Sequence, residues 1–324
     1  MRTRQLGNSE LELTVVGLGC WAMGSGGWEF GWGPQDDADS ISTIIKAVEM
    51  GVNWIDTAAI YGLGHSEKVV GKAIKELGEK PIVATKCGIS WDSSGNINRH
   101  LDRERVRKDI EASLRRLDIE PIDLYQIHWP FPDENIEQAW EEMAKLVEEG
   151  KVRFIGVSNF SVEQLERIGR IYPPASLQPP YSMVGRDIEK DLLGYCARNN
   201  IGVTVYSPMQ KGLLTGKFSA ERVSQLAEDD HRRRDADFQE PKLSATLKLV
   251  DDLRKIAERN DGTLGQLAIA WVLRREEVTA AIAGARRPQQ IEETAPAGDW
   301  QLCDDDVVEI EELLRKREDT LGIA

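Results

Sequence analysis

Four side chains that together could reduce a carbonyl group follow three short apolar segments of the chain. Asp56 and then Tyr61 follow the first segment, Lys86 follows the second, and His128 follows the third. In a parallel barrel, catalytic groups sit where strands end and the loops after them begin. If the three segments are neighbouring strands, the spacing predicts one site that contains all four side chains.

These residue types fit the reduction of a carbonyl by hydride transfer. The hydride leaves negative charge on the carbonyl oxygen, and a proton must be delivered there. Tyr61 is the candidate general acid, but tyrosine is a poor acid at neutral pH because its reference pKa is near 10. A nearby ammonium lowers such a pKa by roughly 1–3 units. We expect Lys86 to act in this way, Asp56 to keep Lys86 charged, and His128 to donate a hydrogen bond to the oxygen.

Each residue also has a simpler interpretation when it is taken alone. An Asp at a strand end is often a helix cap, a Lys there is often solvated or ion-paired, and a His is often structural. A Lys at a barrel strand end can also form a Schiff base, as in lyases of the aldolase type. That chemistry needs a neutral amine, which Asp56 opposes, and it leaves Tyr61 without a purpose.

The elements that must position these residues alternate between strands and helices. Amphipathic stretches predict helices at Ser40–Met50, Arg103–Leu117 and Asn135–Glu149, and Ser161 with Gln164 predicts a capping box at a further helix. Short apolar runs predict strands that are buried on both faces, at Val15–Leu18, Asn53–Asp56, Ile82–Thr85, Ile122–Ile127, Phe154–Val157, Ser176–Gln178, Gly202–Tyr206 and Ala280–Ala283. Eight such units favour a single (β/α)₈ barrel domain over residues 1–324 more than an open doubly wound sheet.

Two segments depart from this alternation. Arg4–Leu6 and Glu10–Thr14 flank a turn, and we expect a β-hairpin there that plugs the bottom of the barrel. Gly212–Pro241 is long and charged, which is typical of a functional loop or of a partly disordered segment. It is either a solvated insertion or a cover for a cofactor, and the sequence leaves both open.

Composition bounds the partners and the compartment. The 324 residues are 41% hydrophobic and carry a formal net charge of −14, so phosphate backbones and anionic membranes are repelled. We expect no nucleic acid or membrane partner, and a monomer or weak oligomer. The segment at the start lacks the apolar run of a signal peptide, and no run is long enough to span a membrane. The cysteines form no metal-ligand spacing and indicate a reducing cytoplasm: Cys20, Cys87, Cys196 and Cys303.

Several motifs resemble those of the aldo-keto reductases. They occur in order from about Arg4 to the C-terminal helix, so the resemblance covers nearly the whole chain. The motifs are Asn53–Gly62, Gly64–Glu67 with Gly71 beyond it, Ala84–Gly88, Ile122–Trp129 and Gly150–Phe160. The resemblance implies an NADPH-dependent reductase of aldehydes and ketones on a (β/α)₈ barrel, with NADH as a weaker cofactor. No Rossmann G-x-G-x-x-G follows the first strand, as expected if a barrel holds the dinucleotide.

The resemblance also implies a nicotinamide site at the ends of the later strands. Ser158, Asn159 and Gln178 match residues that hydrogen-bond the carboxamide, and Tyr206 matches an aromatic that stacks on the ring. The first loop borders the cofactor beside Asp56, through Gly19, Cys20 and Trp21. A stretch along the pyrophosphate is matched by Ser207, Pro208, Gly212, Leu213 and Lys217.

The adenosine end of the cofactor is matched by the last loop of the barrel, through Gly284, Arg286, Gln290 and Glu293. Glycine lets the backbone approach a phosphate closely, and Arg286, with Arg287 in support, suits a 2′-phosphate. The next candidate for that phosphate is the cluster Arg232–Arg234. Ala283 and Thr294 stand where many relatives have proline and asparagine, which weakens the assignment of the adenine contacts.

The substrate side is expected to be aromatic, because the glycine-rich first loop carries several large rings. Rings can stack on an apolar substrate or simply pack the barrel rim. The candidates are Trp28, Trp32, Trp91 and Trp129. A small carbonyl or alcohol is the expected substrate, although its identity is not specified. Some relatives of the family serve as cofactor-sensing subunits of potassium channels, but the complete set of four catalytic residues favours an enzyme.

Overall fold

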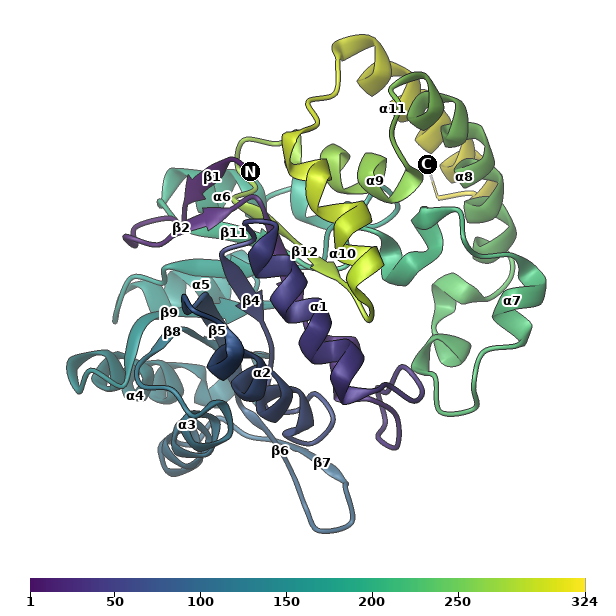
Figure 1. The fold of residues 1–324 in the computed structure, drawn as a ribbon. Coiled ribbons are helices and arrows are strands. Elements are labelled where there is room, and N and C mark those ends of the chain that lie inside the picture. The colour runs from purple at the N-terminus through teal and green to yellow at the C-terminus, as the bar shows by residue number, and fades with distance from the viewer. Residues whose placement is uncertain (324) are drawn as a thin grey trace.

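Eight parallel strands form a closed barrel in the computed structural model, which describes residues 1–323 (Figure 1). Around the barrel the strands follow the order β10-β11-β12-β3-β4-β5-β8-β9. Their bounds are β3 Val16–Gly19, β4 Trp54–Asp56, β5 Ile82–Cys87, β8 Ile122–Ile127, β9 Val152–Ser158, β10 Ser176–Gln178, β11 Gly202–Val205 and β12 Ala280–Gly284. All eight were predicted, with small shifts at their ends, and the predicted (β/α)₈ barrel is confirmed.

A hairpin closes the end of the barrel at which the strands begin, as predicted. Its strands β1 (Thr3–Gln5) and β2 (Glu12–Thr14) pair antiparallel. Three buried leucines of this segment pack with Trp54 and Leu124, whose side chains fill the barrel interior. The turn needs glycine at Gly7, because its φ is +53° and a Cβ there would lie 2.4 Å from the backbone nitrogen of Gly202. The apolar plug leaves the opposite end of the barrel as the open one.

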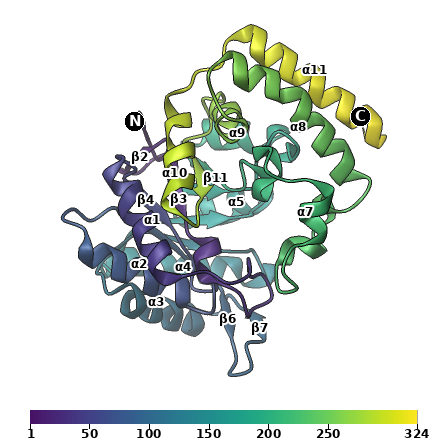
Figure 2. The ribbon, with the colours of Figure 1, turned by 45° about the vertical axis from the view of Figure 1, so that its right-hand side comes forward.

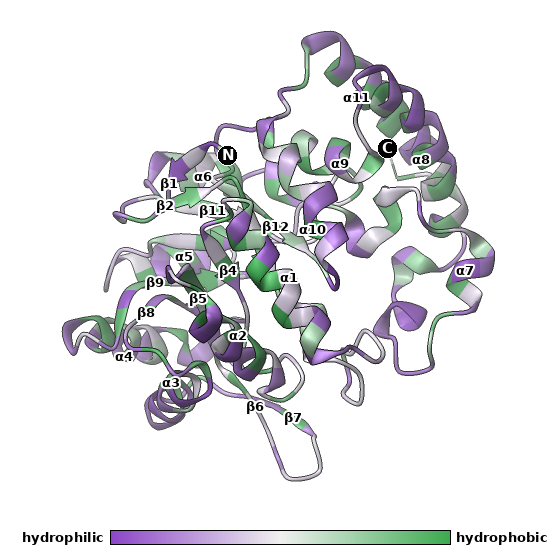
Figure 3. Cartoon of the chain, viewed as in Figure 1, coloured by the Kyte–Doolittle hydropathy of each residue, from purple (hydrophilic) through white to green (hydrophobic). Residues whose placement is uncertain are grey.

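Helices surround the barrel and turn their apolar faces toward it (Figures 2 and 3). The helix that follows β9 begins with the predicted capping box, in which the Ser161 and Gln164 side chains and backbones bond reciprocally. The α-helices are α1 Asp37–Glu49, α2 His65–Glu76, α3 Arg103–Leu117, α4 Ile136–Glu148, α5 Val162–Gly169, α6 Leu192–Arg198, α7 Ala220–Ser224, α8 Lys242–Arg259, α9 Leu264–Leu273, α10 Pro288–Thr294 and α11 Asp304–Leu321. α8 and α11 lie side by side on the outside (Figures 1 and 2).

Two parts of the structure differ from the sequence-based expectation. The segment 212–241 is not a structureless run, because it contains α7 and short 3-10 helices at His231–Arg234 and Ala236–Phe238. Buried Leu213 and Phe238 anchor it in a small apolar cluster of its own. An additional hairpin, β6 (Ile89–Trp91) with β7 (Ile97–Arg99), projects from the loop after β5 (Figure 1).

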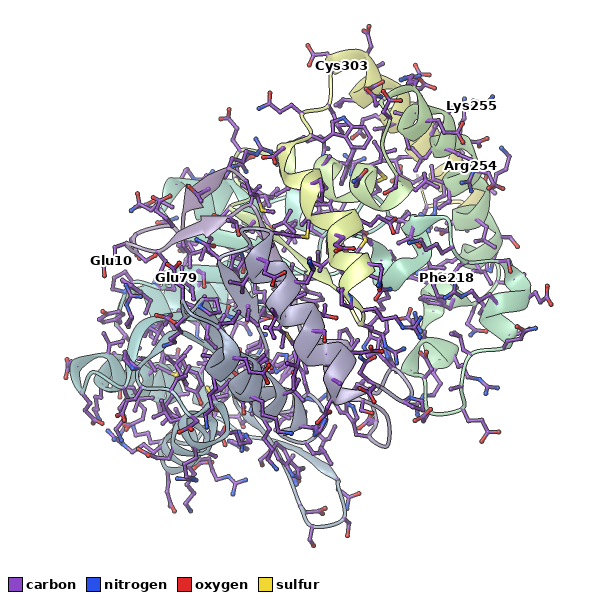
Figure 4. The ribbon with its side chains drawn as sticks, in the orientation of Figure 1. Glu10, Glu79, Phe218, Arg254, Lys255 and Cys303 are labelled. Carbon is purple, nitrogen blue, oxygen red and sulfur yellow. The ribbon has the colours of Figure 1, made fainter. Side chains whose placement is uncertain are left out.

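None of the helices in residues 1–323 is long and apolar enough to cross a membrane. The same residues contain no group of three or more His, Cys, Asp or Glu side chains that could hold a metal ion. The four cysteines are free thiols. Three of them are buried, and Cys303 lies at the surface just before α11 (Figure 4).

Candidate active site

The core of the candidate site is a buried ion pair between two barrel strands. Asp56 ends β4 and is 3% exposed, and Lys86 lies on the neighbouring β5 and is 1% exposed. The Lys86 Nζ lies 2.8 Å from each Asp56 carboxylate oxygen and 2.9 Å from the carbonyl oxygen of Thr57. An ammonium has three donors, and all three have an acceptor here. The geometry therefore fits a charged Lys86.

Tyr61 is held over this ion pair by the turn that follows β4. The Lys86 Nζ lies 5.3 Å from the centroid of the Tyr61 ring. His128, at the end of β8, approaches the same ring edge-on with 5.7 Å between centroids. Within residues 1–323 neither the Tyr61 hydroxyl nor the His128 imidazole has a hydrogen-bond partner. The structure thus brings the four predicted residues together and leaves two hydrogen-bonding groups available at the open end.

The first loop fixes the backbone of the turn that carries Tyr61. Gly62 has a φ of +63°, and a Cβ at this position would lie 2.0 Å from the carbonyl oxygen of Gly24. Only glycine allows this approach. On the other side, Thr57 Oγ1 and Ser66 Oγ are 2.9 Å apart, and Ser66 Oγ donates to the Cys20 carbonyl. The predicted motif around Tyr61 therefore specifies a tight turn as well as a reactive group.

The pKa values show how burial tunes the site. Burial, and then the Asp56 carboxylate, raise the pKa of Tyr61 well above 10. The expected lowering by Lys86 is wrong for the protein without ligands, because burial and then the Asp56 carboxylate outweigh the effect of that ammonium. Burial, and then the charge of Lys86, lower the pKa of His128 well below 6.5. Burial also lowers the pKa of Lys86, and Asp56 opposes this effect. At neutral pH Tyr61 is protonated and His128 is neutral.

The residues predicted to bind the carboxamide lie beside the ion pair and are linked to it. The Gln178 Nε2, on β10, donates to Asp56 Oδ2 at 2.9 Å. Ser158, at the end of β9, donates to the Gln178 carbonyl at 2.8 Å. Asn159 follows in a left-handed conformation with a φ of +65°, and its side-chain amide donates to the His128 carbonyl at 3.0 Å. Tyr206 donates its hydroxyl proton to Asn159 Oδ1 at 2.9 Å.

This network divides the barrel mouth into two halves. The catalytic candidates stand on β4, β5 and β8, whereas the predicted cofactor residues follow β9, β10, β11, β12 and β3, which complete the circle. The Tyr206 ring is half-buried and borders the interior cluster. Gly284 ends β12 in open space, because no atom lies within 4 Å of the position that a Cβ would occupy there. A flat ring and an open glycine on one side of the mouth are features that an extended dinucleotide needs.

The stretch after β11 has an irregular backbone. Ser207, Gln210 and Lys211 have positive φ angles, and Gly212 has a φ of +99°. Pro208 and the buried Leu213 lie within the same bends. The backbone nitrogens of Gln210 and Gly212 donate to the carbonyls of Ser207 and Met209, so hydrogen bonds within the stretch hold these bends. Lys217, predicted for the same stretch, instead pairs with Glu293 of α10, another predicted cofactor residue.

Arg286, predicted to bind the 2′-phosphate, is held by neighbouring backbone and side-chain oxygens in this structure. Its guanidinium donates to the Gln35 Oε1 at 2.7 Å and to the Trp32 carbonyl at 3.1 Å, and it also contacts the Pro34 carbonyl. All three acceptors are uncharged. The Gln290 Oε1 accepts hydrogen bonds from the backbone nitrogens of Arg286 and Arg287. Gln290 therefore stabilises the conformation of this loop.

The predicted substrate tryptophans occupy different environments. Trp28 is 9% exposed, and its indole donates to the Ser25 carbonyl, so it packs the first loop. Trp129 is 36% exposed and stacks on Phe131, with 6.3 Å between the ring centroids. Trp91 lies on β6, and Arg116 covers its ring at 5.7 Å. Trp32 lies under Arg232 at 4.5 Å.

Sequence reasoning missed a second aromatic contact over the catalytic turn. Trp21 stacks on Tyr61 with 6.1 Å between ring centroids, and His231 also stacks on Trp21, with 4.8 Å between centroids. The His231 Nδ1 lies 3.1 Å from the Gly31 carbonyl oxygen, and Trp32 pairs with Asp230 in a β-bridge. The segment around His231 is therefore a cover over the first loop. The charged sequence around His231 contains no pattern that predicts its contact with Trp21.

Comparison with known proteins agrees with this geometry. The model of the aldo/keto reductase family matches residues 22–315. The chain belongs to the aldo/keto reductase family. It is 38% identical over 317 residues to the aldo-keto reductase YhdN of Bacillus subtilis, covering 97% of this chain and 94% of the relative. It is 33% identical over 327 residues to an NADH-specific methylglyoxal reductase of Escherichia coli, covering 97% and 98% of the two chains.

The solved structures extend this match to three dimensions. The glycerol dehydrogenase AKR11B4 of Gluconobacter oxydans superimposes with a TM-score of 0.88 at 38% identity, covering 97% of this chain and 95% of that one. The aldo-keto reductase AKR11C1 of Bacillus halodurans, in its holo form, gives 0.81 at 25% identity, covering 97% and 96%. As a member of this aldo/keto reductase family, the protein is an oxidoreductase that acts on carbonyl compounds.

Proposed function

We propose that this aldo/keto reductase reduces an aldehyde or ketone with NADPH, and that Tyr61 is the proton donor. The observation that carries the proposal is the free Tyr61 hydroxyl beside the free His128 imidazole, above the Lys86–Asp56 pair. A carbonyl oxygen placed between the two side chains would accept two hydrogen bonds. The bound reduced nicotinamide supplies the hydride to the carbonyl carbon.

The protonation states of Tyr61 and His128 at neutral pH suit the reduction of a carbonyl. Tyr61 keeps its proton over the physiological pH range because its pKa is raised, so the acid form is always present. His128 is neutral, because its pKa is lowered, and it therefore orients the oxygen without releasing a proton of its own. As the proton leaves Tyr61, the Lys86 ammonium, whose Nζ lies 5.3 Å from the ring centroid, stabilises the developing phenolate. A well-placed acid of this kind contributes about 10²–10⁴-fold to the rate.

The Schiff-base alternative is disfavoured by the donor set of Lys86. Nucleophilic attack needs a free lone pair on the amine, but three acceptors at 2.8–2.9 Å surround the Lys86 Nζ. Removing a proton would break one of these bonds and leave a buried carboxylate without a counter-ion, which is costly. The same pair has a clear purpose beside a tyrosine that must lose a proton.

Arg286 supports the choice of NADPH over NADH. Within residues 1–323 no carboxylate pairs with its guanidinium, which contacts only neutral oxygens of residues 32–35. Exchanging these neutral acceptors for a 2′-phosphate would form charge-assisted bonds of about twice the strength. One relative, from Escherichia coli, is described as NADH-specific, and another, from Schizosaccharomyces pombe, as using NADP⁺. The family thus contains both choices, and Arg286 decides between them in this chain.

The remaining proposals concern the nicotinamide contacts, the substrate surface and the cellular compartment of the enzyme. We assign the carboxamide contacts to Ser158, Asn159 and Gln178 and the ring contact to Tyr206. The exposed pair of Trp129 and Phe131 offers an apolar surface next to His128 for the rest of the substrate. Four free cysteines fit a reducing cytoplasm, and one core cluster that runs from the first strand to the last helix fits a single working unit.

The direct test is reduction of a panel of aldehydes, ketoses and quinones, followed by the loss of NADPH absorbance at 340 nm. The proposal expects turnover of at least one carbonyl class, with NADH as a poorer donor. The matched control is borohydride with the same carbonyls, which would trap a Schiff base on Lys86. Covalent trapping without NADPH or NADH oxidation would refute the reductase.

A further inference from the structure

A cavity lies between β6 and one face of α3, and Ala59, from the turn before Tyr61, also lines it. Figure 1 labels both elements. Its volume is about 300 Å³, which is the lower end of the range for small-molecule sites. The α3 side chains that line it recur at helical spacing and so share one face of the helix. Trp91 and Ile89, on β6, form the apolar wall opposite. We call this space the α3 cavity.

The α3 cavity is basic in a chain that is strongly acidic overall. Four cations line it, namely Arg105, Lys108, Arg115 and Arg116, although the whole chain carries a net charge of −14. Lys108 pairs with Glu104 at 2.5 Å and Arg116 with Glu67 at 2.6 Å.

The other two cations lack such a carboxylate. Among residues 1–323, the Arg105 guanidinium donates only to the Ser90 hydroxyl, at 2.5 Å, and the Arg115 guanidinium has no ion pair or hydrogen bond. Ser90 precedes Trp91, so the half-buried Arg105 reaches the apolar wall of the cavity. A guanidinium in this position has donors to spare and a partly desolvated setting, which strengthens its attraction for an anion.

The single acid that lines the cavity does not cancel this charge. Asp109 accepts a hydrogen bond from the Gly88 backbone nitrogen at 3.0 Å. Its other neighbours are His100, whose Nε2 lies 3.6 Å away, the cations Arg105 and Arg116, and the more distant Glu67. Burial raises the pKa of Asp109 to about 7 despite these cations. At neutral pH this carboxyl is therefore only partly ionised.

We propose that the α3 cavity binds a small organic oxyanion, such as a sulfate monoester, a phosphate monoester or the carboxylate of an organic acid. Its charged end contacts Arg105, and its apolar part lies against Trp91 and Ile89. Arg115, at the edge of the cavity, attracts the anion electrostatically without contacting it. This assignment gives Trp91 a role apart from the proposed carbonyl site, and it does not depend on the reductase chemistry.

The test uses phenyl sulfate as the probe, in calorimetric titrations of the full-length protein at pH 6 and low ionic strength. Phenyl sulfate joins a ring to a single permanent charge. A charged hydrogen bond changes affinity by roughly 10-fold or more, so Arg105→Gln should weaken binding at least 10-fold. Arg115→Gln, which changes only an exposed side chain, should weaken it 2- to 5-fold in a salt-dependent way.

The matched control is Arg103→Gln. Arg103 lies on the same helix but pairs with Glu141 of α4, away from the cavity, so this variant loses the same charge without losing a ligand contact. Equal losses in Arg103→Gln and Arg105→Gln, or no binding to the wild type, would overturn the proposal. Binding that disappears when NADPH saturates the protein would also overturn it, because the probe would then occupy the cofactor site.

The pH dependence of phenyl sulfate binding tests whether the bound anion lies beside Asp109. The charge of phenyl sulfate is constant between pH 6 and pH 8, and the lowered pKa of His100 keeps that imidazole neutral over most of this range. Asp109 is the group that titrates near 7. Binding should therefore tighten several-fold as the pH falls from 8 to 6, and Asp109→Asn should bind equally well at both. An unchanged affinity in the wild type would overturn the placement of the anion beside Asp109.

Discussion

Replacing Lys86 by methionine tests whether the buried ion pair is both a structural and a chemical device. Methionine retains much of the side-chain volume but removes the charge and all three hydrogen bonds to Asp56 and Thr57. Asp56 is 3% exposed and would keep only the bond from Gln178 at 2.9 Å. Water cannot readily compensate for the lost ammonium at this depth.

The expected loss of stability follows from that geometry. Removing one member of a buried ion pair costs about 3–5 kcal/mol, because the other charge stays buried and unpaired. Urea unfolding of Lys86→Met should show this loss of unfolding free energy. Turnover should fall by roughly 10²–10⁴-fold, since no cation remains near the Tyr61 phenolate.

A double variant separates the two effects. Asp56→Asn together with Lys86→Met removes both charges, so its stability should recover by more than about 1 kcal/mol relative to the sum of the single losses. Activity should not recover, because the cation near Tyr61 is still missing. A loss below about 1 kcal/mol in Lys86→Met, or additive single losses, would refute the reasoning about the pair.

Three further outcomes are expected. Tyr206→Ala should weaken NADP⁺ binding by about 1–3 kcal/mol, by analogy with base stacking on aromatic rings, and unchanged affinity in a fluorescence titration would show that another residue covers the nicotinamide. Arg286→Ala should raise the Kd of NADPH by roughly 10- to 150-fold with little change for NADH; equal effects on both would place the phosphate elsewhere, with Arg232–Arg234 the next candidates. The folded-state pKa of Asp109, about 7 against 3.8, means that the folded form binds the extra proton, so unfolding free energy should fall as the pH rises from 4 to 7 by an amount on the order of 4 kcal/mol. Asp109→Asn should lack this slope in urea titrations, and a wild type without the slope would contradict the assigned pKa.

The barrel was predictable because its strands carry strong local signals. Mostly apolar runs such as Ile122–Ile127 are buried along their whole length in the structure, as a parallel strand between helices requires. The polar residue at the end of each run then falls at the open end of the barrel. Asp56, Lys86 and His128 were found from this rule alone.

Other features depend on contacts between distant segments, which sequence periodicity does not contain. The charged run at 229–235 looked like a solvated insertion or a cofactor cover. In the structure, Asp230 and Arg232 pair with one another, and His231 inserts against Trp21. The direction of the Tyr61 pKa shift was also missed, because that shift depends on burial and then on the Asp56 carboxylate rather than on Lys86.

The motif that follows Tyr61 illustrates a role that resemblance alone did not specify. Glu67 is completely buried, accepts a hydrogen bond from Thr85 at 2.6 Å and pairs with Arg116 of α3. It therefore links α2 to α3 and to β5, the strand that carries Lys86. A glutamate in a sequence gives no indication of such burial until its partners are known.

The central claim, that Tyr61 donates the proton, is tested most directly by the turnover of Tyr61→Phe with NADPH and the best carbonyl substrate of the panel. Phenylalanine keeps the ring that contacts Trp21, Lys86 and His128 and removes only the hydroxyl. The account predicts that kcat falls by roughly 10²–10⁴-fold while the Kd of NADPH stays nearly unchanged. A variant that retains a tenth of the wild-type kcat would contradict it.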